Sequence, residues 1–258
     1  MTEISESLDT KTTLRRLVEW EISGMGLHPG GSNYVFVVRL EDPDRPAADL
    51  EDKDPAGAMF GIYKPSAGER PLRDFPFGTL HLRERASYLL ATALGWPDIP
   101  PTVVREGPHG EGSVQLFIDA DVEANYFTLR DDCLHLFEPV AMFDVLAHNA
   151  DRKGGSCLKA DADGRIWAID HGLTFNPMAR RRTVMFEFNG QEYPVELLDD
   201  VQRVADDLAD GDSDLAVEMS ALLSESEIEG LRRRAERMLQ SRRFPMLDPN
   251  VNVPWPFI

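Results

Sequence analysis

The sequence predicts an α+β fold with two lobes, a mainly β N-terminal lobe over residues 1–118 and a mainly α C-terminal lobe over residues 119–258. Up to Ile118, short β-prone apolar runs alternate with turns rich in glycine and proline. After Ile118, apolar residues recur instead at the spacing of helices. A chain of 258 residues can bury one large core or two smaller ones, so two packed lobes are expected.

Local patterns define the elements of the N-terminal lobe. Apolar residues at helical spacing predict a helix with Gly95 as its stop signal, and β-prone runs between turns predict four strands. The glycine-rich stretch from Gly24 to Gly31 predicts a flexible loop before the first strand. The expected ranges are 10–22 for a first helix or extended lead-in, 34–40, 58–64, 102–105 and 113–118 for the strands, and 80–94 for the helix.

The C-terminal lobe begins with an apolar helix that leads directly into a polar loop, followed by a hairpin and a helical region. The expected ranges are 139–148 for the helix, 149–156 for the loop, 157–159 and 165–169 for the hairpin, and 194–240 for the helical region. The last segment, residues 244–258, combines several prolines with Trp255 and Phe257. Because it cannot be helical and its aromatic side chains must pack, we expect a strap across this lobe.

The composition is that of an ordinary globular protein, with 42% apolar and 9% aromatic residues. No apolar run approaches the roughly 20 residues that cross a bilayer, and the first residues lack the apolar segment of a secretory signal. We therefore expect a cytoplasmic protein and do not expect membrane association. Cys133 and Cys157 are too few and too far apart for a disulfide framework, a metal knuckle or a redox pair.

Charge narrows the set of partners. The formal net charge of −18 would repel a polyphosphate backbone, so no nucleic-acid partner is expected. Any bound phosphate must then be neutralised locally by lysine, arginine or a metal ion. The cluster 180–182 either recognises an acidic or phosphorylated substrate or is a solvated turn. The basic stretch 232–243 is expected to pair with the acidic stretch 199–214 of the same chain.

The N-terminal lobe carries two features that suit phosphate binding. Backbone N–H groups around Gly31, Ser32 and Asn33, in the glycine-rich loop, could form a nest for phosphates, although a plain turn explains this loop better when it is taken alone. Lys64 ends an apolar strand and needs an anion or an acidic partner, and Glu84 lies on the helix that follows. A surface lysine and a solvated glutamate are the alternative.

The C-terminal lobe carries two acidic residues in similar settings. Asp151 lies in the polar loop after a helix, and Asp170 follows a strand and precedes His171 and Gly172. Two such carboxylates can divide the chemistry, one acting on a substrate hydroxyl while the other holds Mg²⁺. Two turn acids beside glycines are the alternative.

Taken together, these motifs resemble the phosphatidylinositol 3- and 4-kinase superfamily, especially type II phosphatidylinositol 4-kinases and HipA-type atypical kinases. Asp-Arg-Lys-Gly-Gly and Ile-Asp-His-Gly are similar to the catalytic and metal-binding loops of that group, and residues 61–65 and 83–94 to its lysine strand and glutamate helix. The resemblance spans residues 24–175 and implies a divergent, two-lobed protein-kinase-like fold with ATP between the lobes. The whole chain, with its Pro-Trp-Pro tail, resembles an actinobacterial group of kinase-like proteins.

The resemblance implies a role for each matching residue. Asp151 would orient the substrate hydroxyl, Asp170 would be the main ligand of Mg²⁺ or Mn²⁺, and Ser156 would occupy the second metal-ligand position. Lys64 would bind the α- and β-phosphates of ATP, with Glu84 fixing it. The remaining matches are Arg152 and Lys153 as partners of the transferring phosphoryl group, Gly31, Ser32 and Asn33 in the phosphate loop, and Gln115, Phe117 and Ile118 in the hinge strand that meets adenine.

The function predicted by the resemblance is transfer of the γ-phosphoryl group of ATP to a hydroxyl acceptor. The acidic balance makes a small molecule or a protein at least as plausible an acceptor as a lipid. One position departs from the pattern, because type II lipid kinases and HipA-type kinases have asparagine where this chain has Ser156. A pseudokinase, binding nucleotide without turnover, is therefore a second hypothesis. A metal-dependent phosphohydrolase built on His148, Asp151, Asp170 and His171 is a third, which leaves Lys64 unexplained.

Overall fold

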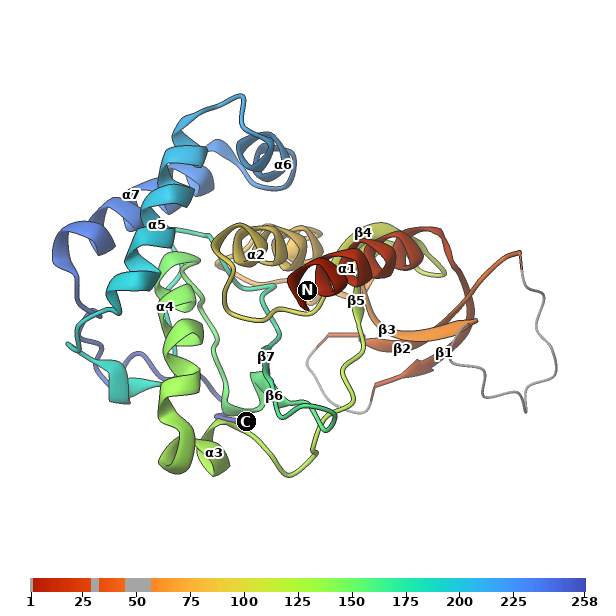
Figure 1. Cartoon of the computed structure of the whole chain (residues 1–258), viewed down its shortest axis with the longest axis horizontal. Coiled ribbons are helices and arrows are strands. Elements are labelled where there is room, and N and C mark those ends of the chain that lie inside the picture. The colour runs from red at the N-terminus through yellow and green to blue at the C-terminus, as the bar shows by residue number, and fades with distance from the viewer. Residues whose placement is uncertain (1, 29–32, 45–56) are drawn as a thin grey trace. The chain divides into compact units, whose positions relative to one another are not determined.

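The computed structural model describes residues 2–28, 33–44 and 57–258, with side chains from residue 10 onward (Figure 1). The chain forms two compact units: unit 1 comprises residues 1–85 and 100–117, and unit 2 comprises residues 86–99 and 118–258. Unit 1 is built on an antiparallel sheet and unit 2 is mainly helical, so the α+β prediction is confirmed. The division differs from the expected one because residues 86–99, which include the second part of the glutamate helix, belong to unit 2.

Unit 1 contains one helix ahead of a five-stranded antiparallel sheet with strand order β1-β2-β3-β5-β4. Its elements are α1 (Thr2–Glu19), β1 (Glu21–Leu27), β2 (Phe36–Glu41), β3 (Ala58–Pro65), β4 (Thr102–Gly107) and β5 (Gly110–Leu116), with a short 3-10 turn at Ser66–Gly68. Gly24 and Gly26, expected in a flexible loop, lie in β1, where they pair with Arg39 and Val37 of β2. Pairing with a neighbouring strand here overrides the loop preference of glycine.

The core of unit 1 lies between α1 and the sheet. Figure 1 shows α1 alongside β4 and β5, which it contacts. The buried side chains of this core are Leu17, Trp20, Val38, Leu40, Tyr63, Val103 and Val114. The Arg105 guanidinium donates to the carbonyl oxygens of Leu17 and Trp20, at 2.9 and 2.7 Å, and so satisfies acceptors at the C-terminal end of α1.

Helix α2 (Leu80–Leu94) matches the expected range, and Gly95, with φ +88°, follows its end. The Glu69 carboxylate accepts the N–H groups of Gly78, Thr79 and Leu80 at 2.7, 3.2 and 2.8 Å, which satisfies donors at the start of the helix. Residues 80–85, with Glu84, belong to unit 1, and the rest of the helix belongs to unit 2.

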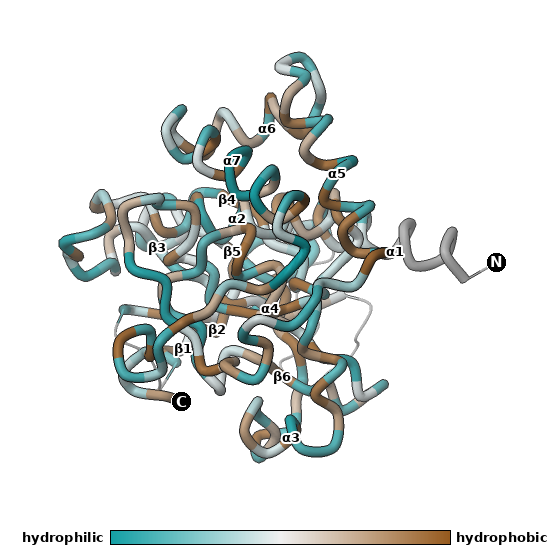
Figure 2. Tube along the Cα trace, turned by 90° about the vertical axis from the view of Figure 1, so that its left-hand side faces the viewer, coloured by the Kyte–Doolittle hydropathy of each residue, from teal (hydrophilic) through white to brown (hydrophobic). Residues whose placement is uncertain are grey.

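Unit 2 contains five further helices and a small hairpin among the described elements. They are α3 (Tyr126–Cys133), α4 (Glu138–Leu146), β6 (Cys157–Lys159), β7 (Ile166–Ala168), α5 (Val195–Ala209), α6 (Asp214–Leu222) and α7 (Glu225–Ser241), with 3-10 turns at Leu134–Phe137, Gly154–Ser156 and Phe186–Phe188. Helix α4 is largely buried and apolar, whereas α7 is hydrophilic and packs against α4 and α5 (Figure 2). None of the described helices is long and apolar enough to cross a bilayer.

The segment after α7 lies across unit 2, as the strap interpretation expects, but Trp255 and Phe257, whose side chains were expected to pack, are 82% and 45% exposed. Phe244 stacks on Phe188 and packs against Tyr193, with ring centroids 5.4 and 4.4 Å apart. Farther along, the carbonyl oxygen of Asn252 accepts the N–H of Thr183 at 2.9 Å. This segment therefore fastens residues that are distant in sequence.

Candidate functional site

The lysine and glutamate predicted to act together form an ion pair within unit 1. Lys64 Nζ lies 2.6 Å from Glu84 Oε1, and the two side chains are 20% and 5% exposed. Lys64 is placed by β3, opposite Ser113 of β5. A Cβ atom on Gly112 would lie 2.5 Å from the Lys64 carbonyl oxygen, so a glycine is needed where β5 passes the end of β3. The predicted contact between strand lysine and helix glutamate is confirmed.

The phosphate loop is only partly within the described residues. Gly31 and Ser32 lie outside them. Asn33 is described, and its Oδ1 atom accepts the N–H of Arg70 at 3.0 Å. The side chain of Asn33 thus fixes the loop that follows β3, and its contact with phosphate stays a prediction.

The residues expected in the hinge strand occupy the end of β5 and the residues after it. Gln115 is buried and its Nε2 atom donates to Thr102 Oγ1 at 2.8 Å, so its side chain supports the sheet. The N–H of Phe117 donates to the Phe60 carbonyl oxygen at 3.0 Å. Ile118 is the first residue of unit 2 after this strand. The contact of this segment with adenine stays a prediction.

In unit 2, the buried carboxylate of Asp144 on α4 organises the loop that carries Asp151. Asp144 Oδ1 accepts from Asn149 Nδ2 at 2.9 Å and from Arg152 Nη2 at 3.0 Å, and its Oδ2 accepts from Arg152 Nε at 2.7 Å. Asn149 Oδ1 in turn accepts the N–H of Asp151 at 2.9 Å. One carboxylate therefore holds residues on both sides of Asp151. We call residues 149–156 the Asp151 loop.

Arg152 has an internal role that the sequence did not reveal. Its side chain is 0% exposed. Besides Asp144, its guanidinium donates to the carbonyl oxygens of Ser156 and Ile169, at 2.8 and 3.0 Å, and to His171 Nε2 at 2.8 Å. These bonds use all five guanidinium N–H groups, so none remains for the transferring phosphoryl group that Arg152 was expected to meet. Since arginine only donates, His171 Nε2 is an acceptor here and is not available to a metal ion.

Asp151 lies in a partly buried, mixed electrostatic environment. Lys153 Nζ is 3.4 Å from Asp151 Oδ2. Burial raises the pKa of Asp151 above its ordinary value, against the opposing effects of Lys153 and Arg182, and the nearby Asp170 raises it further. A carboxylate with a raised pKa is a stronger proton acceptor than an ordinary aspartate once it is ionised.

Asp170 and Ser156 present two oxygen atoms suited to one hard cation. Ser156 Oγ donates to Asp170 Oδ2 at 3.3 Å. Neighbouring ligands in an octahedron of about 2.1 Å radius lie about 3 Å apart, so both oxygens fit one Mg²⁺. Asp170 has φ +61°, a strained conformation for a residue other than glycine that often marks functional positions. No group of three or more His, Cys, Asp or Glu side chains among the described residues could hold a metal ion.

The C-terminal segment reaches both flanks of the Asp151 loop. The N–H of Gly154 donates to the Phe257 carbonyl oxygen at 2.7 Å, and a Cβ atom on Gly154 would lie 2.7 Å from the Phe127 ring. Asn252 Nδ2 donates to the carbonyl oxygen of Arg181 at 2.9 Å. The next residue, Arg182, accepts the N–H of Arg152 at 3.1 Å through its carbonyl oxygen. The prolines and aromatics predicted packing of this segment, but no local pattern indicated its target.

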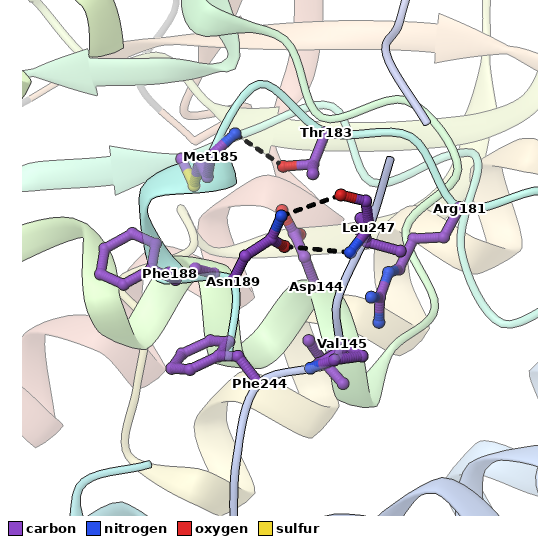
Figure 3. A pocket seen from close by; sticks show the side chains of 11 residues that line it. Asp144, Val145, Arg181, Thr183, Met185, Phe188, Asn189, Phe244 and Leu247 are labelled. Carbon is purple, nitrogen blue, oxygen red and sulfur yellow. Dashed lines mark hydrogen bonds between the residues drawn. The ribbon is translucent and has the colours of Figure 1, made fainter. Parts of the chain in front are cut away.

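A small pocket beside Asp144 does not provide a substrate site (Figure 3). Its volume is about 20 Å³, which admits a single water molecule. Figure 3 shows Asn189 bonded twice to Leu247, at 2.9 Å through its Nδ2 and at 3.2 Å through its Oδ1. These bonds keep the segment after α7 against the pocket.

Comparison with known proteins identifies one relative by sequence. No protein-family model matches the chain. Protein Rv2133c of Mycobacterium tuberculosis is 34% identical to it over 234 residues, covering 77% of this chain and 83% of Rv2133c. The chain belongs to the Rv2133c family. The name of this relative states no activity, so the family assignment by itself leaves the function open.

Solved structures show the fold of this Rv2133c family member. The Golgi casein kinase with Mn/ADP bound matches with a TM-score of 0.55 and 14% identity, over 90% of this chain and 75% of the kinase. A hydra Fam20 with sugar matches with a TM-score of 0.54 and 12% identity, over 91% of this chain and 88% of Fam20. The Helicobacter pylori proinflammatory kinase CtkA matches with a TM-score of 0.51 and 13% identity, over 88% of this chain and 94% of CtkA. The predicted kinase-like fold is confirmed. None of these three is named as a phosphatidylinositol kinase, so that finer resemblance stays a prediction.

Breaking the ion pair between Asp144 and Arg152 should be more damaging than removing both charges. We expect Asp144→Leu to lower the free energy of unfolding by about 3–5 kcal/mol, because it leaves Arg152 buried and unpaired. The double variant Asp144→Leu with Arg152→Met should lose much less than the sum of the single changes. Chemical denaturation of the four proteins measures this coupling, and additive losses would contradict it.

Detaching the C-terminal segment should loosen the Asp151 loop. Removing residues 256–258 takes away the acceptor of the Gly154 N–H, and loss of one such bond is worth about 1 kcal/mol, or about fivefold faster amide exchange. Hydrogen–deuterium exchange of residues 152–156 measures this effect. Asn252→Ala should accelerate exchange at Thr183, with Asn250→Ala as its control because Asn250 bonds only within its own turn to Asp248. Unchanged protection of Gly154 in the shortened chain would contradict the assignment.

Proposed function

We propose that this protein is an ATP-dependent phosphotransferase that moves the γ-phosphoryl group of ATP to a hydroxyl acceptor. The observation that carries the proposal is the 2.6 Å pair between Lys64 and Glu84 in a chain with the fold of known kinases. A glutamate that is 5% exposed holds the ammonium group in one orientation, as a fixed positive charge for phosphates requires. Lys64 would contact the α- and β-phosphates, and Glu84 would position it.

The proposed cofactors are ATP with Mg²⁺ or Mn²⁺. The similar Golgi casein kinase is described with Mn/ADP bound, which supports nucleotide and divalent metal as the ligands to test. Asp170 and Ser156 would supply two metal ligands, and the nucleotide phosphates with water would supply the rest, as is usual for Mg²⁺ in phosphoryl transfer. The bound metal would neutralise phosphate charge.

In the proposal, Asp151 orients the acceptor hydroxyl and accepts its proton. The raised pKa of Asp151, caused first by burial, favours proton acceptance by the ionised carboxylate. Lys153, 3.4 Å from this carboxylate, would face the transferring phosphoryl group, whereas Arg152 would act by holding the loop. The acceptor would be a small molecule or a protein. The phosphatidylinositol 3-/4-kinase-like type rests on the sequence resemblance.

A nucleotide-binding module without turnover is the second candidate, favoured by Ser156. Its neutral hydroxyl is buried and bonded to Asp170, and it is a shorter ligand than asparagine. We do not propose a phosphohydrolase. His148 Nε2 is bonded to the Ala179 carbonyl oxygen at 2.8 Å, and His171 Nε2 accepts from Arg152, so neither nitrogen is available to a metal ion.

Nucleotide binding is tested by thermal shift with ATP and Mn²⁺. We expect wild-type protein to melt at a higher temperature with ATP and Mn²⁺ than without them, and the double variant Lys64→Met with Glu84→Gln to bind about 10- to 100-fold more weakly, since it loses a charged phosphate contact. The double change avoids leaving a buried carboxylate unpaired. Lys159→Met, on β6, is the control that changes the same charge elsewhere. Equal shifts in all three proteins would contradict the proposed role of Lys64.

Turnover is tested separately by phosphate release and autophosphorylation with labelled ATP. Asp151→Asn should keep the nucleotide-dependent shift and lower turnover about 100-fold or more, because proton transfer by a positioned group contributes at least that much. Asp161→Asn, an exposed acid in the β6–β7 turn, is the matched control. Wild-type protein that binds ATP and shows no turnover would favour the second candidate. Undiminished turnover in Asp151→Asn would exclude Asp151 from the chemistry.

A further inference from the structure

Four basic side chains from three segments lie close enough in unit 2 to affect one another electrostatically. Arg234 and Arg237 lie on α7, His148 follows α4, and Arg181 lies in the segment bonded to Asn252. Arg234 Nε donates to the Leu146 carbonyl oxygen at 2.7 Å, which ties α7 to the end of α4. We call Arg181, Arg234, Arg237 and His148 the basic cluster.

A close approach of α7 to the segment before Arg181 completes this arrangement. His148 Nε2 bonds to the carbonyl oxygen of Ala179 at 2.8 Å. A Cβ atom on Gly230 of α7 would lie 3.3 Å from the Pro177 side chain. The three segments are therefore packed together, and the basic cluster is a built feature rather than a set of mobile surface chains.

The basic cluster lacks the carboxylates that the sequence predicted for it. Arg234 is 8% exposed, and its Nη2 atom is buried with no hydrogen-bond partner among the described residues. Among these residues, no carboxylate forms an ion pair with Arg181 or Arg237 either. The nearest acid that acts on Arg234, Glu227, is engaged by Ser224, whose N–H and hydroxyl donate to it at 3.0 and 2.7 Å. The expected pairing with the acidic stretch is thus wrong for Arg234 and Arg237, the two members of the basic cluster that belong to the stretch 232–243.

The basic groups of this cluster repel one another, as the pKa values of Arg234 and His148 indicate. Burial, followed by repulsion from Arg181 and Arg237, lowers the pKa of Arg234 to about 9 despite the opposing effect of Glu227. Burial, together with repulsion from the three arginines of the cluster, lowers the pKa of His148 to about 4, against the effect of its bond to Ala179. A buried guanidinium without a counter-charge is costly, and a bound anion would offset that cost.

We propose that the basic cluster binds a phosphoryl group, either free phosphate or the phosphate of a phosphorylated hydroxyl. The arginines are graded in exposure, with Arg234 buried, Arg181 half-buried and Arg237 exposed, so the basic cluster extends from the interior of unit 2 to its surface. Guanidinium groups bind tetrahedral oxyanions through paired N–H bonds. A dianion matches three positive charges better than a single carboxylate does. Figure 3 shows Arg181 from the side of the small pocket beside it.

An anion bound here would also act on the segment beside Asp151. Arg181 precedes Arg182, whose carbonyl oxygen accepts the Arg152 N–H at 3.1 Å. Thr183 is bonded to Asn252. Fixing the Arg181 side chain therefore stabilises a segment that already contacts the Asp151 loop. Binding would raise the melting temperature without any nucleotide.

The test is a titration of the full chain with inorganic phosphate, and separately with glycerol phosphate, by isothermal calorimetry at low ionic strength without nucleotide. Wild-type protein should bind one equivalent saturably. Arg181→Gln should weaken binding about tenfold or more, as expected for loss of a charged hydrogen-bond donor. Arg233→Gln is the matched control, because Arg233 lies on α7 next to Arg234 but is 69% exposed and pairs with Glu229.

A second measurement keeps the proposal falsifiable if the variants differ in stability. Arg234→Met retains the apolar stem, and it should melt at a higher temperature than wild type without phosphate and gain no further increase when phosphate is added. Tighter binding of glycerol phosphate would assign the site to a phosphorylated partner. Tighter binding of inorganic phosphate would assign it to the free ion. Either result supports the proposal. Absence of saturable binding, or equal weakening in Arg181→Gln and Arg233→Gln, would overturn it. The double variant at Lys64 and Glu84 should bind phosphate normally, so failure of the ATP proposal is distinguishable.

Discussion

The ion pair between Asp144 and Arg152 is the interaction on which the geometry around Asp151 depends. Both side chains are buried, so each is tolerated only because the other is present. Their bonds join α4 to Asn149, to the carbonyl oxygens of Ser156 and Ile169, and to His171. Residues before and after both candidate aspartates, Asp151 and Asp170, are thereby fixed to one rigid helix. This scaffold lets positive-φ residues such as Asp170 persist, because strained conformations need surroundings that over-determine them.

Local signals in the sequence predicted well those elements whose boundaries are local. Helix α2 was found to the residue, since apolar periodicity and Gly95 both belong to the segment itself. The glycines of β1 led to the wrong prediction of a flexible loop, because they form a strand only through pairing with β2. Asp144 carried a usable signal as a charged residue in an otherwise apolar helix. The resemblance implied that its partner Arg152 meets the transferring phosphoryl group, whereas Arg152 is buried by its contacts with Asp144 and Ile169.

The contacts of the C-terminal segment show why tertiary targets escape such reasoning. Prolines and aromatics in residues 244–258 predict that the chain is extended and packed. They do not predict that the carbonyl oxygen of Phe257 accepts the N–H of Gly154. Every residue has a backbone carbonyl oxygen, so the residue type does not indicate which one will be used. Gly154 was interpreted through its motif, yet it is also the residue whose missing side chain admits the Phe127 ring. One glycine can therefore satisfy a motif and a packing constraint.

Net charge is a poor guide to what a particular site can bind. The value of −18 argues against a polyanion that would lie along the whole surface. Charges separated by more than a Debye length of about 8–10 Å hardly affect one another in physiological salt, so a small anion responds to its immediate surroundings. Around Arg234, those surroundings are two further arginines and a histidine, with Glu227 already bonded to Ser224. The acidic remainder of the chain keeps polyanions away while leaving this position open to a single phosphoryl group, and so adds selectivity by size.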